Sequence, residues 1–194
     1  MIPVRPTNLE PTFLVGDASG MGFGASKWTQ DDSFVRTTHG NWAARITFDA
    51  SSNYRESANL ALEICRMCSK RELPPSSELW VFTDNSTAES TFYKGGSTSP
   101  HLHQIVLELQ KLDMEGLLII HFVWFSGKHM IAQDTHDLSR GNLTSWVMAG
   151  DNFLKFIPLN ETAFEREPKL DVTIQSWLPD KWRITFQHLT GSMK

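Results

Sequence analysis

The amino-acid sequence predicts an α/β fold in which helices cover both faces of a mixed sheet. Within residues 13–48, a short apolar run, an alternating segment after a tight turn and a third strand-like segment predict an antiparallel meander. Apolar residues recur every three to four positions in 54–70 and 101–114, which indicates amphipathic helices. Two short apolar runs, 79–83 and 117–125, have the length of buried strands. A meander followed by strand–helix–strand units gives a mixed sheet flanked by helices.

Three strands are expected in the first part of the chain. The apolar run 13–16 forms the first strand, and the small residues at 18–20 suit a tight turn into the second. The third strand comes from 34–38 and 42–48, where the pair His39-Gly40 can interrupt it.

The helix predicted at 54–70 has capping signals at its start. Asn53 is a suitable N-cap, and Glu56 follows three residues later, as in a capping box. The pair Cys65-x-x-Cys68 lies within this helix; because the chain has no other cysteine, we expect core residues and not a zinc or redox pair. Further helices are expected at 86–94, 101–114 and 131–138.

The length of 194 residues fits one domain with an extension. Residues 1–12 form a lead-in that prolines interrupt. The predicted strands and helices all fall within 13–141. The mixed segment 142–194 is expected to pack on the domain or to link it onward.

The composition excludes several classes of protein. The formal net charge of -4, from 18 basic and 22 acidic residues, argues against a nonspecific nucleic-acid coat. Two cysteines cannot build a disulfide scaffold. No apolar run approaches the ~20 residues of a membrane span, and the first residues lack the apolar core of a signal peptide. We therefore expect no membrane partner and an intracellular location, cytoplasmic or nuclear.

Acidic residues fall where neighbouring elements of such a sheet converge. Asp17 ends the first apolar strand, Asp84 ends the strand at 79–83, and Glu56 lies in the first turn of the first long helix. Carboxylates that converge repel one another, and a divalent cation relieves this repulsion. Oxygen ligands favour Mg²⁺ or Mn²⁺ over Zn²⁺. The sequence therefore predicts a site for such ions. Asp134 and Asp137, which flank His136 near the last predicted helix, are further candidate ligands.

Four sequence blocks together resemble the ribonuclease H domain of retroelement polyproteins. They are DASGMGFGA at 17–25, NYRE at 53–56, TDNS at 83–86 and LSRG at 138–141. The resemblance is to gypsy-like and, more closely, DIRS-like elements, whose ribonuclease H domain follows a reverse transcriptase. It spans about 13–141 and implies a five-stranded mixed sheet of order 3-2-1-4-5 flanked by helices.

The resemblance implies an endonuclease that hydrolyses the RNA strand of an RNA–DNA hybrid with two metal ions, Mg²⁺ or Mn²⁺. The family's catalytic acids match Asp17, Glu56 and Asp84, and Asp17 would bridge both ions. His129 occupies the loop where some ribonucleases H carry a histidine that shuttles protons or assists product release. The implied partners are the nucleic acid and a reverse transcriptase domain of the same polyprotein.

The position of the fourth family acid stays open. Counting back from Arg140 places it at His136, and counting forward from Gly127 places it at Asp134. Asp137 lies one residue after His136, about 100° around a helix. Either Asp134 or Asp137 reaches the metal, or His136 ligates it and favours Mn²⁺, or the site is weakened.

Two other hypotheses compete with that of a ribonuclease H-type endonuclease. A catalytically silent module of the same fold, which binds nucleic acid or serves as a scaffold, is the alternative that the histidine at 136 keeps open. An integrase-type nuclease is a weaker alternative, since such sites usually place their Glu on a late helix.

Glycines at 20, 22 and 24 are expected to permit close packing or approach of the substrate. Basic side chains near the site are expected to contact phosphates: Lys27, Arg36, Arg45, Arg55, Lys128 and Arg140.

Overall fold

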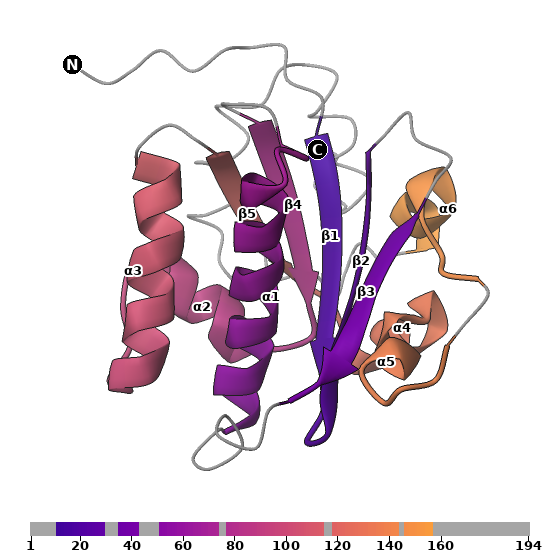
Figure 1. Cartoon of the computed structure of the whole chain (residues 1–194), viewed down its shortest axis with the longest axis horizontal. Coiled ribbons are helices and arrows are strands. Elements are labelled where there is room, and N and C mark those ends of the chain that lie inside the picture. Colours follow the sequence, from indigo (N-terminus) through magenta and orange to yellow (C-terminus); the bar gives the residue numbers. More distant parts are fainter. Residues whose placement is uncertain are drawn as a thin grey trace, which may run out of the picture.

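A five-stranded mixed sheet forms the centre of the computed structural model (Figure 1). The structure describes residues 11–29, 35–42, 51–73, 77–114, 118–143 and 146–156. The strands are β1 (Pro11–Ala18), β2 (Gly22–Thr29), β3 (Arg36–Asn41), β4 (Ser77–Thr83) and β5 (Leu118–Trp124). Their order is β3-β2-β1-β4-β5, with β1, β2 and β3 antiparallel and β1, β4 and β5 parallel. The predicted order of the sheet is thus confirmed.

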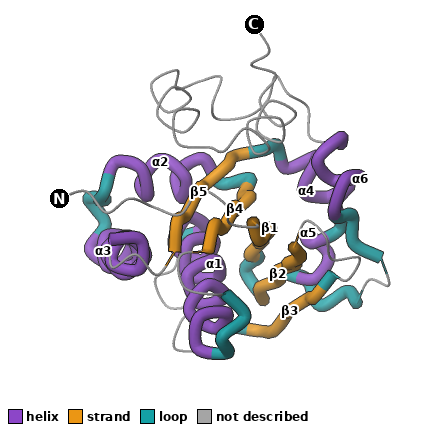
Figure 2. The backbone as a smooth tube through the Cα atoms, turned by 90° about the horizontal axis from the view of Figure 1, so that it is seen from above, coloured by secondary structure: helices purple, strands orange, loops and turns teal. Residues whose placement is uncertain are grey.

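Helices cover both faces of the sheet, as the sequence predicts (Figure 2). One side carries α1 (Ser52–Ser69), α2 (Ser86–Lys94) and α3 (Pro100–Met114), and the other carries α4 (Gly127–Gln133), α5 (Thr135–Leu138) and α6 (Gly150–Phe156). Alternating strand residues point to opposite faces. Leu14 accordingly packs in a cluster with Leu60 and Ile64 of α1, whereas Phe13 and Val15 pack in a second cluster with Phe153 of α6.

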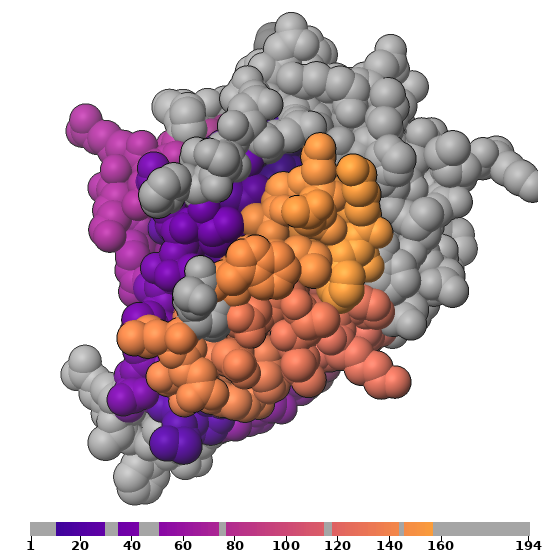
Figure 3. Space-filling view, turned by 90° about the vertical axis from the view of Figure 1, so that its right-hand side faces the viewer, coloured from indigo at the N-terminus to yellow at the C-terminus, as the bar shows by residue number. Residues whose placement is uncertain are grey.

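The helix α6 belongs to this second cluster although it follows the predicted 13–141 unit. Phe153 is buried, and its ring contacts Trp28, Phe82 and Phe125, with centroid distances of 5.1, 5.0 and 6.0 Å. Figure 3 shows α4, α5 and α6 together on one face of the molecule. The lead-in up to residue 10 and the segment 157–194 lie outside the described residues.

Two local predictions, one at the start of α1 and one within β3, were wrong. Ser51, not Asn53, caps α1, and its side chain accepts a hydrogen bond from the Tyr54 amide. Asn53 instead accepts a hydrogen bond from the side chain of Asn85, so tertiary contact overrides the capping signal. The pair His39-Gly40 does not interrupt β3, because Phe23 pairs with Gly40 and its ring fills the space of a side chain there. Residue 34 and residues 43–48 of the predicted third strand lie outside the described segments.

The glycines at 22 and 24 allow a helical turn to lie directly on β2. A Cβ atom at Gly22 would lie 2.9 Å from the Ser139 carbonyl oxygen, and one at Gly24 would lie 2.7 Å from the Ser139 amide nitrogen. Both distances are shorter than side chains tolerate. The prediction of close packing is confirmed at these two positions, whereas a Cβ at Gly20 would meet nothing within 4 Å.

Two predictions on α1 and β2 were also wrong. Cys65 is exposed, against the prediction of a core residue, whereas Cys68 is half-buried and packs against the core cluster that contains Leu60 and Ile64. Lys27 is buried, and its Nζ lies 2.8 Å from Glu63 and 2.7 Å from Glu72, which leaves no charge for a phosphate. Arg45 lies outside the described residues. Among the helices that the structure describes, none has the length and apolar character needed to cross a membrane.

Candidate metal centre

Three acids meet at one edge of the sheet, as the sequence predicts. Asp17 lies near the end of β1, Asp84 follows β4, and Glu56 comes from α1. Because β1 and β4 are adjacent and parallel, their carboxyl ends lie side by side. One ligand oxygen of each of these residues lies within 4.8 Å of the others. Within the described segments this is the one group of three or more such side chains that could hold a metal ion.

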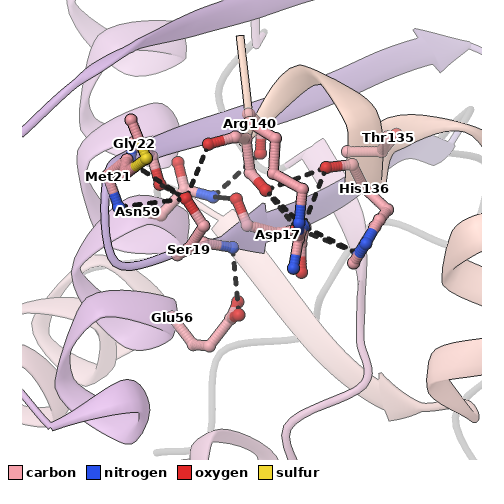
Figure 4. Close-up of polar contacts among 12 residues, drawn as sticks. Asp17, Ser19, Met21, Gly22, Glu56, Asn59, Thr135, His136 and Arg140 are labelled. Atoms are coloured by element: carbon pink, nitrogen blue, oxygen red, sulfur yellow. Dashed lines mark hydrogen bonds and ion pairs between the residues drawn. The ribbon is translucent and has the colours of Figure 1, made fainter. Parts of the chain in front are cut away.

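Asp17 is the most heavily contacted of the three acids. Its side chain is 6% exposed, and Oδ2 accepts hydrogen bonds from the Ser139 hydroxyl and, at 3.2 Å, from the Arg140 guanidinium. His136 Nδ1 lies 3.5 Å from the same oxygen. Figure 4 shows Glu56 on one side of Asp17 and the turn that carries His136 and Arg140 on the other. One oxygen of Asp17 therefore faces a cation within the protein itself.

Glu56 has one oxygen that is satisfied and one that is not. Oε1 accepts a hydrogen bond from the Ala18 amide at 3.0 Å. Oε2 is buried and has no hydrogen-bond partner among the described residues. Burial, and then the charges of Asp17 and Asp84, hold the pKa of Glu56 well above its ordinary value. The capping-box interpretation of Glu56 is therefore wrong, because the carboxylate turns toward β1.

Asp84 completes the group from a half-buried position. Burial raises the pKa of Asp84, and the charge of Asp17 raises it further. Its backbone carbonyl accepts a hydrogen bond from Trp124 Nε1 at 2.9 Å, which fixes the end of β4 against β5. The next residue, Asn85, caps α2 by accepting hydrogen bonds from the amides of Thr87 and Ala88. Because Asn85 does the capping, the Asp84 side chain is left to face the other acids.

The candidates for the fourth acid lie in different surroundings. Asp134 joins α4 to α5 with a left-handed backbone, φ 86°. The Asp137 carbonyl accepts hydrogen bonds from the amides of Arg140 and Asn142. Neither residue joins the group of three acids, and it is His136 that lies beside Asp17. Metal binding by Asp134, Asp137 or His136 stays a prediction.

His129 lies in the first turn of α4. Its Nδ1 shares a hydrogen bond with the Ser126 hydroxyl, and its ring packs edge-on against Phe156 of α6 at 5.1 Å. These contacts connect the helix to the C-terminal end of the described chain. A role of His129 in proton transfer or product release stays a prediction.

Two residues at the site were missed in the sequence. Asn59 lies one turn after Glu56, and its Nδ2 donates to the carbonyls of Asp17 at 3.0 Å and of Gly24 at 2.9 Å. Ser139 donates to Asp17, and its own carbonyl accepts from the Ser19 hydroxyl at 2.7 Å. The three-residue spacing from Glu56 could have indicated Asn59, since residues three apart share a helix face. Ser139 gave no comparable signal outside the family block.

The donor set fits a hard divalent cation. Carboxylate oxygens are the ligands that Mg²⁺ and Mn²⁺ prefer. The buried Glu56 Oε2, which lacks a hydrogen-bond partner in the described chain, would gain one from an ion. Burial is the main cause of the raised pKa values of Glu56 and Asp84, and the charge of Asp17 adds to it; an ion would relieve that repulsion.

Comparison with known proteins defines the fold. The N-terminal RNase H domain of a Mycobacterium tuberculosis protein is similar to 69% of this chain and 96% of its own, at 17% identity and a TM-score of 0.51. RNase H1 of the halophilic archaeon Halobacterium salinarum matches 70% of this chain and 94% of its own, at 13% identity and a TM-score of 0.47. An RNase H1 called LC11, in complex with an RNA/DNA hybrid, matches 66% and 91%, at 15% identity and a TM-score of 0.43.

No protein-family model matches the chain, and no curated protein matches its sequence significantly. The similarity to the mycobacterial domain and the sheet order together show the class: this chain has the ribonuclease H fold.

The buried carboxyl of Glu56 predicts a pH dependence of stability in the metal-free protein. A carboxyl whose pKa is higher in the folded state binds more protons there than in the unfolded chain. Raising the pH above the ordinary carboxyl range near 4 therefore lowers the free energy of unfolding, until the raised pKa is passed. Replacing Glu56 with Gln removes this loss. We expect the variant to be more stable than the parent by about 1–3 kcal/mol at pH 8, and less so at pH 5.

Denaturant unfolding in EDTA from pH 5 to pH 8 measures this difference. Glu108→Gln, at an exposed position on α3, is the matched control and should show no change with pH. A Glu56→Gln stability difference that is the same at every pH would contradict the prediction.

Proposed function

We propose that this chain is a metal-dependent nuclease that hydrolyses the RNA strand of an RNA–DNA hybrid. The observation that carries the proposal is the group of Asp17, Glu56 and Asp84 at the carboxyl edge of a ribonuclease H fold, with one buried oxygen lacking a hydrogen-bond partner within the described chain. The four sequence blocks support this choice of substrate.

In this proposal the three acids hold divalent ions, Mg²⁺ or Mn²⁺. Such ions polarise a phosphodiester and activate a water molecule when bound, and two of them can stabilise the attacking and leaving oxygens. Glu56 is held in place by the Ala18 amide, and Asn59 fixes the backbone of Asp17. These contacts keep the carboxylates in position before substrate arrives. Recognition would depend on duplex shape and 2′-hydroxyl groups, not on base sequence.

The retroelement origin is the finer part of the proposal. It rests on the four sequence blocks, of which LSRG at 138–141 forms the turn that brings Arg140 to Asp17. A reverse transcriptase produces RNA–DNA hybrids, so a domain of this kind beside it would remove the RNA strand. We therefore propose that the chain acts with a reverse transcriptase domain of the same polyprotein.

A cleavage assay on three duplexes and one single strand tests the proposed activity. The protein is incubated with an end-labelled RNA–DNA hybrid, double-stranded RNA, double-stranded DNA or single-stranded RNA, in Mg²⁺, Mn²⁺ or EDTA. We expect cuts in the RNA strand of the hybrid, dependent on the ion, and none in EDTA. Folded protein that cuts no hybrid with either ion would overturn the proposal.

A silent module is the second candidate function, and the side chain at 136 favours it. The structure places a histidine, and not a fourth carboxylate, beside Asp17. Such a module would bind the hybrid without cleaving it. The same assay, combined with a gel-shift measurement of hybrid binding, separates the two candidates.

A further inference from the structure

We infer that Arg140, held by His136, is an internal counter-cation that competes with a divalent ion for Asp17. The inference deepens the proposed function and rests on its metal-binding part. In the substrate-free protein the guanidinium occupies one side of Asp17, so that the free site takes up a single ion.

The contacts of Arg140 show how it is held. Its NH1 group lies 3.2 Å from Asp17 Oδ2, 3.0 Å from the Ser139 hydroxyl, 3.1 Å from the His136 carbonyl and 2.9 Å from His136 Nδ1. A guanidinium has donors and no acceptor. NH1 carries two hydrogens, so it donates to two of these four neighbours at a time, and Nδ1 of His136 is an acceptor whenever it is one of the two.

The two contacts of Arg140 with His136, at its carbonyl and at Nδ1, indicate what His136 does. While Nδ1 accepts from Arg140, its lone pair is not available to a metal ion. His136 then acts as a positioning residue, because it orients the guanidinium toward Asp17. The histidine at the fourth family position thus supports a positive group where the family pattern has a negative one.

The charges agree with a single ion. Three carboxylates and one guanidinium leave two negative charges at the site, which one divalent ion neutralises. The buried Oε2 of Glu56, which has no hydrogen-bond partner in the described chain, lies on the other side of Asp17 from Arg140 and marks the place of that ion. A second ion at Asp17 Oδ2 requires Arg140 to leave.

Arg140 is able to leave. Its side chain is 44% exposed, whereas that of Asp17 is 6% exposed. Water can solvate the released guanidinium, and ion pairs with an exposed partner contribute little to stability. The released side chain would then be free to contact a phosphate of the substrate. The contact to Asp17 is therefore an exchangeable one.

Metal titration of the whole chain tests the inference with Arg140→Gln. Isothermal calorimetry with MnCl₂ gives affinity and stoichiometry, and thermal unfolding with and without MnCl₂ gives stability. We expect Arg140→Gln to bind Mn²⁺ at least about fivefold more tightly, the change that a modest ion pair corresponds to. Its metal-free melting temperature should fall while the rise on adding MnCl₂ grows. A merely structural role of Arg140 would lower both melting temperatures equally.

Two further variants complete the design. Arg66→Gln, which removes an arginine paired with Glu63 on α1, is the control and should leave Mn²⁺ affinity unchanged. His136→Asp adds a fourth carboxylate and should produce a second Mn²⁺ binding event. Unchanged affinity in Arg140→Gln, two ions in the parent protein, or no Mn²⁺ binding in any variant would each overturn the inference.

The hybrid-cleavage assay on the same samples separates this inference from the proposed function. Tighter Mn²⁺ binding by Arg140→Gln in a protein that cuts no hybrid would support the counter-cation and refute the nuclease. If the parent protein cuts the hybrid but the Arg140→Gln substitution does not change Mn²⁺ affinity, the nuclease is supported and the counter-cation is refuted.

Discussion

Replacing Asp84 with Asn is expected to lower the rate of hybrid cleavage by at least about 10³-fold, because a bound ion contributes several kcal/mol to phosphoryl-transfer chemistry. The folded state should not suffer. Burial and the charge of Asp17 raise the pKa of Asp84, so the neutral amide removes a repulsion. We therefore expect an unchanged or higher melting temperature in EDTA. Initial rates at saturating Mg²⁺ and a thermal scan measure the two effects.

Matched asparagine variants show whether the loss belongs to the site. Asp113→Asn, near the end of α3, is half-buried like Asp84 but lies outside the acidic group and should cleave at the parental rate. Asp134→Asn and Asp137→Asn test the fourth family position directly. An Asp84→Asn protein that keeps a tenth or more of the parental rate would remove Asp84 from the proposed mechanism.

Replacing Phe153 with Ala is expected to lower the free energy of unfolding by about 3–5 kcal/mol, the usual cost of truncating a buried aromatic ring. The ring is fully enclosed by Trp28, Phe82 and Phe125, from β2, β4 and the residue after β5. Its loss would leave a cavity on the face of the sheet that α6 covers. Urea unfolding of the full chain measures the change.

Leu143→Ala is the control for this core prediction. Leu143 is 74% exposed, so its truncation should change the free energy of unfolding by less than about 0.5 kcal/mol. A similarly small effect of Phe153→Ala would mean that α6 does not belong to the cooperative core. The proposed boundary of the domain at residue 141 would then stand, with the residues beyond it as a separate extension.

The fold was predictable because its signals are local. The apolar run of β1, the alternation along β2, and the three-to-four spacing in α1 and α3 follow from which faces each element buries. The start of α1 was not predictable in the same way. Asparagine is a common N-cap residue, but the side chain of Asn53 accepts a hydrogen bond from Asn85 instead. Asn85 is distant in the sequence and becomes a neighbour of Asn53 only in the folded chain.

In the candidate site, too, local sequence signals predict some residues, whereas others depend on tertiary packing. The meeting of Asp17 and Asp84 follows from strand ends in a parallel pair, and Glu56 follows from a helix packed on them. The contacts of Ser139 and Arg140 with Asp17 depend on how one short turn packs against β2. No spacing in the sequence gives that packing, which is why the identity of the residue opposite Asp17 stayed open between Asp134, His136 and Asp137.

The missing side chains of Gly22 and Gly24 have an electrostatic consequence. The turn at Ser139 rests on these two positions with no space for a methyl group, so they set how far Arg140 lies from Asp17. The strength of an ion pair depends on that distance. The charge balance of the acidic group is therefore adjusted from β2, by residues that carry no charge and coordinate nothing.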